Sequence, residues 1–346
     1  MKKIALSALN GFLAEIAAKQ TVIAPVENAG QVDFGVWDAD QKLRLDVLKT
    51  VKSAKGAFFP QVEDMVRFHM EGKKIDINPA EVMNEDFVIF GVRACDARSF
   101  ELLDRVFLSE PVDPFYAARR AHGTVVTLAC NQPEENCFCS NFDIDAANPA
   151  GDVSAWIVGE ELYLRANTEK GEALVAGLAD ANDADVADTQ NEIREITKKL
   201  PLANLNLEGF DGEHLMEKFS DPRWAELSRA CLGCGTCTFV CPTCQCYDVR
   251  DFDTGSGVQR YRCWDSCMFS DFTLMAHGTN RPTQVERFRQ RFMHKLVYFP
   301  SNNDGLYSCG AASPSQGRWD PDSLRPALRL GLKQPLGNAA LGAVFA

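Results

Sequence analysis

Residues 231–242 read CLGCGTCTFVCP, which is the pattern C-x2-C-x2-C-x3-C-P. This spacing is typical of loops that hold a cubane 4Fe–4S cluster, and it makes Cys231, Cys234, Cys237 and Cys241 candidate ligands. A cubane cluster exchanges electrons one at a time. The pattern therefore indicates a redox protein and says little about any substrate.

The small residues of this run suit a tight loop around a cluster. Gly233 and Gly235 allow the backbone to curl and to turn its N–H groups toward sulfur. Pro242 then redirects the chain. A zinc site would more naturally show two separated C-x2-C pairs, so zinc is the alternative metal.

Three cysteines beyond this run are further candidate cofactor ligands: Cys244, Cys246 and Cys267. A buried structural thiol is the alternative for each of these, because free cysteine often behaves as a small apolar residue. Short C-x-C and C-P-x-C spacings are nevertheless unusual for cysteines that only fill space. The fourth thiolate of the first cluster comes from Cys241, Cys244 or Cys246, and the sequence does not choose among them.

The composition excludes some classes of function. The 346 residues predict two or three domains. With 36 Lys+Arg against 48 Asp+Glu the net charge is −12, which argues against sequence-independent nucleic-acid binding. The thirteen cysteines cluster at short spacings, which favours metal ligation in a reducing cytoplasm over disulfides. No apolar run approaches the ~18 residues that span a bilayer.

The N-terminal residues predict an amphipathic first helix. Leu6, Leu9, Leu13 and Ile16 recur at spacings of three, four and three, which places them on one helix face. An export signal is the alternative, because two lysines precede a mostly apolar stretch. Polar residues interrupt that stretch, so the helix is favoured.

Residues 1–200 predict an α/β (α+β) domain. Buried strands are expected at 86–92 (DFVIFGV) and 123–130 (GTVVTLAC), with a helix at 97–108 and a hairpin at 155–166. The sequence contains neither a P-loop nor a G-x-G-x-x-G between a strand and a helix, so no nucleotide site is predicted.

Four more cysteines are predicted to meet at one edge of this sheet. Cys95 and Cys130 each lie just past the C-terminal end of a predicted strand, and Cys137 and Cys139 follow soon after. Ligands gather at those ends in open α/β sheets. We expect a second metal site there; the alternative is two core thiols and an unrelated loop pair.

Three charged residues flank the first of these cysteines: Arg93, Asp96 and Arg98. They either orient the loop and tune a cluster through hydrogen bonds or form surface ion pairs.

Residues 201–309 predict a ferredoxin-like 4Fe–4S module, and residues 310–346 an irregular, atypical tail. Helices are expected at 191–200 and 213–230. The basic segment 281–295 is either a solvated helix face or a docking patch for an acidic partner.

Separate segments of the chain together resemble a family of 4Fe–4S electron-transfer subunits, in which the beta subunit of sulfhydrogenase and the A subunit of anaerobic sulfite reductase are members. The matching segments are residues 58–63, 90–107, 113–120, 129–139, 231–249, 264–269, 276–282 and 291–309. The resemblance implies an electron-transfer subunit with one to three 4Fe–4S clusters, and it makes Cys309 a further candidate cofactor ligand. Electron relay needs no general acid, base or nucleophile, and the residues form no persuasive constellation for one. The resemblance also implies two partners, a flavin-containing subunit that handles NAD(P)H and a catalytic subunit that is a hydrogenase or a sulfite reductase.

The sequence departs from the family after Cys309. The family has a second C-x2-C-x2-C-x3-C-P run there, but the corresponding positions are Ala312, Ser315 and Trp319. In two-cluster ferredoxins the fourth cysteine of each run binds the other cluster. The absence of the second run therefore removes ligands from both clusters. We hypothesise that residues 310–346 are a frameshifted or substituted tail, and a cysteine run in another frame of the encoding DNA would support this.

Two interpretations from other classes remain. One is a zinc-stapled interaction module. The other is a catalytic reductase with its own siroheme or flavin, since the spacings of Cys231 to Cys237 and Cys263 to Cys267 echo a siroheme–cluster ligand set. Cys234 lies between Cys231 and Cys237, and this third cysteine fits a ferredoxin run better than a siroheme ligand set.

Overall fold

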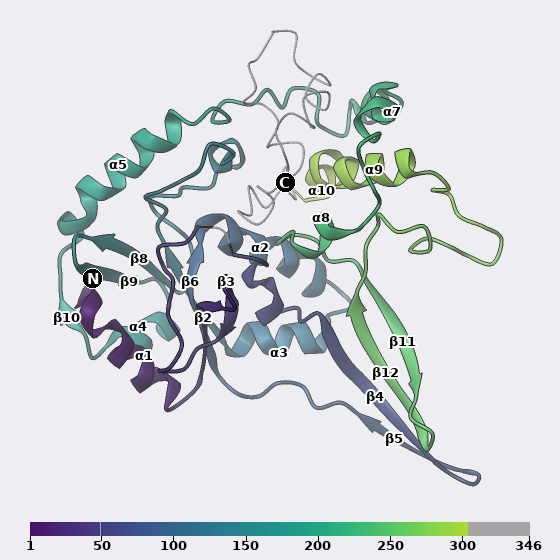
Figure 1. Cartoon of the computed structure of the whole chain (residues 1–346), viewed down its shortest axis with the longest axis horizontal. Helices are drawn as coiled ribbons and strands as arrows, with labels where there is room; N and C mark the ends of the chain where they lie inside the picture. Colours follow the sequence, from purple (N-terminus) through teal and green to yellow (C-terminus); the bar gives the residue numbers. More distant parts are fainter. Residues whose placement is uncertain (49, 304–346) are drawn as a thin grey trace.

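The computed structural model describes residues 1–48 and 50–303. Cys309, the positions of the absent second run and the predicted tail 310–346 all lie outside the described residues. The described part is a mixed α/β structure with an eight-stranded and a four-stranded sheet (Figure 1). The mixed α/β class expected for the N-terminal part is therefore confirmed.

The eight-stranded sheet organises the N-terminal part, with strand order β10-β1-β9-β8-β7-β6-β2-β3. The strands are β1 Lys2–Ala5, β2 Thr21–Asn28, β3 Gln31–Val36, β6 Phe87–Arg93, β7 Gly123–Leu128, β8 Val153–Val158, β9 Glu161–Ala166 and β10 Ala179–Asp180. Strands β2, β6, β7 and β8 pair in parallel, and the outer pairs are antiparallel. Strands β6 and β7 are buried almost throughout, as parallel strands covered on both faces are expected to be.

The strand predictions agree with this sheet. The strand expected at 86–92 is β6, the strand expected at 123–130 is β7, and the expected hairpin is β8–β9. The hairpin turns at Gly159, whose φ of 59° lies in the left-handed region that glycine tolerates.

Helices and short helical turns connect the strands. They are η1 Leu6–Ala8, α1 Leu9–Ala17, η2 Ala54–Ala57, α2 Ala94–Phe107, α3 Pro114–His122, η3 Cys139–Phe142, α4 Glu169–Val175, η4 Asp183–Val186 and α5 Ala187–Lys198. The predicted first helix is confirmed as α1, which buries Leu9, Leu13 and Ile16. Helix α2 begins three residues earlier than the predicted 97–108, so Cys95 lies in its first turn and not in a loop.

The C-terminal part contains α6 Leu215–Phe219, α7 Arg223–Leu227, α8 Thr236–Phe239, α9 Gln284–Met293, the π-helical turn η5 His294–Tyr298 and α10 Phe299–Asn302. One core joins it to the large sheet. Trp156 of β8, Trp224 of α7 and Phe292 of α9 belong to the same cluster of buried side chains. This core crosses residue 200, where a domain boundary is predicted, and that boundary stays a prediction. No helix in the described part is long and apolar enough to cross a membrane.

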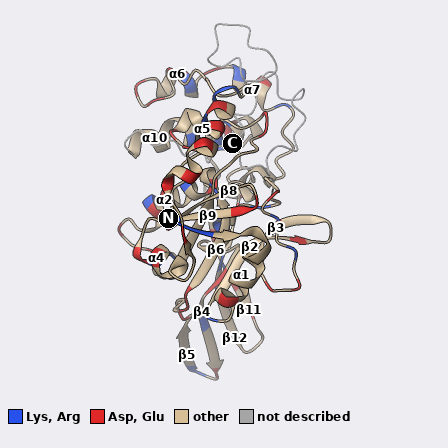
Figure 2. Cartoon of the chain, turned by 90° about the vertical axis from the view of Figure 1, so that its left-hand side faces the viewer, with Lys and Arg blue, Asp and Glu red and all other residues tan. Residues whose placement is uncertain are grey.

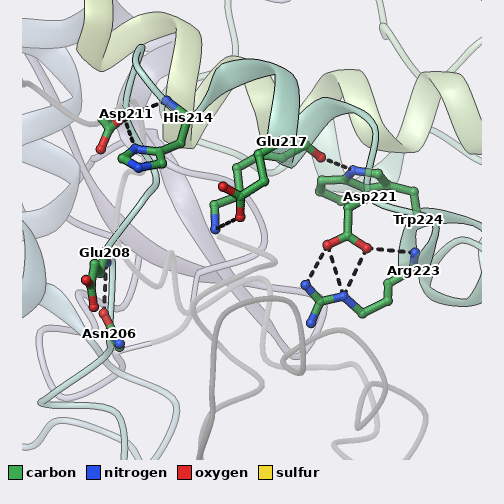
Figure 3. A network of polar contacts seen from close by, with 9 residues as sticks. Asn206, Glu208, Asp211, His214, Glu217, Asp221, Arg223 and Trp224 are labelled. Carbon is green, nitrogen blue, oxygen red and sulfur yellow. Dashed lines mark hydrogen bonds and ion pairs between the residues drawn. The ribbon is translucent and has the colours of Figure 1, made fainter.

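The predicted helix 213–230 is wrong as a single element, because it is split into α6 and α7. Asp221 lies in the break and accepts a hydrogen bond from the backbone N–H of Arg223 at 2.8 Å (Figure 3). The indole of Trp224 donates to the carbonyl oxygen of Lys218 at 2.7 Å. These side chains satisfy backbone groups that a continuous helix would have paired, so the chain turns here.

The four-stranded sheet forms an arm that projects from the body (Figures 1 and 2). Its strands are β4 Val62–Glu71, β5 Lys74–Pro79, β11 Tyr247–Asp253 and β12 Gly257–Trp264, in the antiparallel order β11-β12-β4-β5. The two hairpins that make it are far apart in the sequence. No sequence pattern indicated this sheet. Its central pair β4–β12 joins strands from the two halves of the chain, and spacing along the sequence does not report such a contact.

A buried arginine ties the arm to the body. The side chain of Arg262 is 2% exposed. Its guanidinium forms ion pairs with Glu63 of β4 and with Asp113, which caps helix α3. Glu63 also binds Arg119 of the same helix. This network links three elements around a charge that water does not reach.

Arg262→Met should destabilise the protein by about 3 kcal/mol, because it breaks a buried ion-pair network and leaves carboxylates undercompensated. Denaturant unfolding followed by circular dichroism measures the change. Arg260→Met is the matched control, since Arg260 pairs with Asp251 on the exposed surface of the same sheet and should have a small effect. Equal losses in both variants would contradict this assignment.

Two helical glycines should respond oppositely to alanine. A Cβ at Gly171 would lie 2.1 Å from the carbonyl oxygen of Asp152, so Gly171→Ala should cost about 1–3 kcal/mol or more. Gly11 in α1 has nothing within 4 Å of an added Cβ, so Gly11→Ala should stabilise by about 0.5–1 kcal/mol. The same unfolding measurement compares them, and destabilisation by Gly11→Ala would contradict the packing described.

Candidate metal centres

The structure brings four of the predicted site residues together at one end of the large sheet. We call them the strand-end cysteines: Cys95, Cys130, Cys137 and Cys139. Cys95 lies in the first turn of α2, Cys130 follows β7, and Cys139 begins η3. Burial raises the pKa of the Cys95 thiol well above its ordinary value, and the charges of Asp96 and of the other three cysteines add to this rise. The four thiols are therefore close enough to interact.

Burial dominates the chemistry of this group. It raises the pKa of Cys137 to about 12 and that of Cys139 to about 11, and the neighbouring thiols add to both rises. The backbone N–H of Glu134 donates to Cys137 Sγ at 3.3 Å. Thiols in this setting become thiolates only if positive charge is supplied, as a bound metal would supply it.

The charged residues that flank Cys95 have three different roles. Arg93 Nη1 donates to the carbonyl oxygen of Ala129 at 3.1 Å, and its charge opposes the raised pKa of Cys130, which burial causes. Asp96 is buried, and burial raises its pKa to about 7. Arg98 forms an ion pair with Glu101 at the surface. The surface-pair alternative therefore applies to Arg98, while Arg93 and Asp96 face the interior.

The C-terminal cysteines form a second group, the loop cysteines: Cys231, Cys234, Cys237, Cys241, Cys244, Cys246 and Cys267. Hydrogen bonds join Cys241 to Cys244 and Cys246 to Cys267. Burial raises the pKa of Cys237, and the charges of Cys267, Cys231 and Cys241 contribute to the rise. Cys234 is exposed and is placed in this group by the sequence run, because neither it nor Cys263 on β12 has another cysteine among the groups that shift its pKa.

The glycines of the loop behave as the sequence predicted. Gly233 and Gly235 have φ values of 68° and 74°, which side-chain-bearing residues rarely adopt. A Cβ on Gly235 would also lie 2.6 Å from the ring of Phe269. The loop therefore needs glycine there for both conformation and space.

Three buried cations surround the loop cysteines, and the sequence analysis did not single out this arrangement. Lys295 Nζ donates to Cys241 Sγ at 3.0 Å, and Arg291 Nη1 donates to Cys244 Sγ at 3.3 Å. Lys55 Nζ donates to the carbonyl oxygen of Cys244 at 2.9 Å. Two of them, Arg291 and Lys295, belong to the basic segment 281–295, so that segment is not a wholly solvated face.

The cations change the chemistry of one thiol decisively. Burial alone would raise the pKa of Cys241. The hydrogen bond with Cys244 and the charges of Lys295, Arg291 and Lys55 outweigh burial and hold that pKa well below its ordinary value. The Cys241 thiol is therefore prepared to carry negative charge.

The first turn of α2 has a neighbour in each cysteine group. Cys95 belongs to the strand-end group, while the next residue, Asp96, is close enough to Cys241 for the charge of that thiolate to shift the carboxyl pKa. Asp96 and Cys241 are distant in the sequence but close in space.

The residues of both groups fit iron–sulfur clusters. Both donor sets consist of thiols, and N–H groups point at their sulfurs, including Gln284 Nε2 at 3.2 Å from Cys231 Sγ. In residues 1–48 and 50–303 no three Cys, His, Asp or Glu side chains are placed to hold a single metal ion. A cubane cluster binds each thiolate through a separate iron, so its ligands are spread more widely than those of one ion.

In protein stripped of metal, Cys234 should be alkylated before Cys137. Its hydrogen bond with Thr236 lowers the pKa of Cys234, whereas burial raises that of Cys137 to about 12. Below its pKa a thiol gains about tenfold in thiolate per pH unit, so labelling of Cys137 should keep rising with pH after that of Cys234 has levelled off. Peptide mass spectrometry after iodoacetamide pulses measures both, and faster labelling of Cys137 at pH 8 would refute the assignment.

The comparisons with known proteins agree with this chemistry. The family model described as a 4Fe–4S dicluster domain matches residues 230–313, which includes every loop cysteine. The chain is 32% identical over 296 residues to sulfhydrogenase 2 subunit beta of Pyrococcus furiosus, covering 84% of this chain and 86% of that protein. No solved structure matches the chain. With this identity over most of both chains, the protein belongs to the family of the sulfhydrogenase beta subunits.

Proposed function

We propose that this chain relays electrons inside a cytoplasmic oxidoreductase complex of anaerobic metabolism. The donor or acceptor on one side is a flavin-containing subunit that handles NAD(P)H. On the other side is a catalytic subunit, either a hydrogenase or a sulfite reductase. The observation that carries the proposal is that the first turn of α2 contains Cys95, which neighbours the other strand-end cysteines, and Asp96, which neighbours Cys241.

The proposed ligand sets follow the two groups. The strand-end cysteines hold one 4Fe–4S cluster. The loop cysteines hold another, with Cys231, Cys234 and Cys237 as its first three ligands and a fourth from Cys241, Cys244, Cys246 or Cys267. Cys309 remains a proposed ligand from outside the described residues. A 4Fe–4S cluster, when bound, takes up or releases one electron at a time.

The residues of the chain set the conditions for that exchange. Three of the strand-end cysteines, Cys130, Cys137 and Cys139, are buried, and backbone and side-chain N–H groups donate to the sulfurs of Cys137 and Cys231. Cys234 is exposed and its neighbour Leu232 is 88% exposed. An exposed ligand beside an exposed apolar residue suits electron exchange with a partner protein docked on this edge of the loop.

The name of the Pyrococcus furiosus relative supports only part of the proposal about partner subunits. It describes a subunit of a sulfhydrogenase, so a multi-subunit assembly is the natural setting for this chain. Genes next to the encoding gene would separate the two catalytic partners, because a nickel–iron hydrogenase gene indicates hydrogen and a siroheme reductase gene indicates sulfite.

Protein purified without oxygen should contain about four iron atoms per cluster and show a broad visible absorption that bleaches on reduction. Cys139→Ala should lower the iron content by about one cluster, because it removes a buried strand-end thiol. Cys263→Ala is the control and should retain all the iron, since Cys263 lies outside both groups.

Three results would count against the proposal. A colourless protein that contains zinc and no iron would indicate a zinc-stapled module, and a siroheme or flavin spectrum would indicate a catalytic reductase. Full iron content in Cys139→Ala would remove the strand-end cluster from the proposal.

A further inference from the structure

Two of the buried cations next to the loop cysteines, Arg291 and Lys55, are not balanced by acidic side chains of the described residues. Arg291 and Lys55 are 3% and 2% exposed. Within residues 1–48 and 50–303, no Asp or Glu lies within ion-pair distance of either one. Removing a cation from water without an opposite charge is costly, so these two positions require negative charge close by.

Every polar contact of the two cations is directed at the loop around the cysteines. Arg291 donates to Cys244 Sγ at 3.3 Å and to the carbonyl oxygen of Cys237 at 2.9 Å. Lys55 donates to the carbonyl oxygens of Cys244 and Thr238, at 2.9 and 3.5 Å. The ammonium of Lys55 also lies 4.0 Å from the ring centroid of Trp264, whose π face attracts a cation.

The two cations approach the same loop from opposite ends of the sequence. Lys55 belongs to η2, before the arm, and Arg291 to the last turn of α9. Another arginine of that helix differs: Arg289 stacks on the ring of Phe219 and donates to its backbone carbonyl. The charge at the thiols is therefore a property of position 291 and not of the helix as a whole.

We propose that Arg291 and Lys55 are positioning residues that raise the reduction potential of the cluster held by the loop cysteines. This inference rests on the proposed function. Reduction adds one electron, and hence one negative charge, to that cluster; no bond forms or breaks. Two positive charges fixed in a poorly solvated site stabilise the reduced state more than the oxidised state.

Potentiometric titration of the iron-loaded full chain, followed by electron paramagnetic resonance, tests the proposal. Arg291→Met should make the potential of one cluster more negative, with at least a tenfold loss in its one-electron reduction equilibrium, about 59 mV. Lys55→Met should shift the same signal in the same direction. Arg291→Lys keeps the charge and should restore most of the potential, and Arg289→Met should leave it unchanged.

Iron content is measured in every variant, because a structural role would act there first. Iron-loaded Arg291→Met and Lys55→Met proteins with wild-type potentials would overturn the proposal. Loss of iron from both Met variants would also overturn it, since the cations would then hold the cluster in place and not tune it. An iron-free wild-type chain would instead refute the proposed function, so the two failures are distinguishable.

Discussion

The burial of sulfur beside compensating positive charge is the constraint on which this structure depends. Thiols packed away from water resist ionisation, and here burial raises the pKa of every strand-end cysteine. The loop cysteines are surrounded by cations that oppose this effect. Ligands for an anionic cofactor must be both buried and electrostatically supported, and the two cysteine groups meet this requirement to different degrees.

The rest of the fold supplies the geometry that this constraint needs. The large sheet delivers Cys95 and Cys130 at neighbouring strand ends, and the shared core presses α7 and α9 against the same region. Helix α9 then carries Arg291 to the thiols, while the turn η2 brings Lys55 from the N-terminal half. In the arm, β4 from the N-terminal half pairs with β12 from the C-terminal half, and the ion pairs of Arg262 hold this sheet against the body.

The sulfhydrogenase family membership and this arrangement together describe an iron–sulfur subunit whose chemistry is electron exchange. No nucleophile or general base is required for that task; what matters is where each cluster ligand lies and which charges face it. The exposed Cys234 and the buried strand-end group differ most in their access to solvent.

Local patterns were sufficient for the features that local chemistry controls. Apolar runs indicated β6 and β7, a three-and-four spacing indicated α1, and cysteine spacing indicated the cluster loop with its left-handed glycines. The convergence of the strand-end cysteines was also accessible, because parallel strands end at a common edge. The split between α6 and α7 was not, since the side chains of Asp221 and Trp224 satisfy the backbone there.

The sequence by itself determined the cofactor chemistry and the main strands, because these depend on residue types at short spacing, and the resemblance of separate segments indicated the family. Only the tertiary structure decided the arm, the buried network of Arg262 and the placing of Lys55 and Arg291 against the thiols. Most of these features join residues from opposite halves of the chain, and no spacing along the sequence reports a contact at that distance. Whether a lysine or an arginine faces water or a buried sulfur is settled by packing, which forms only when the two halves of the chain meet.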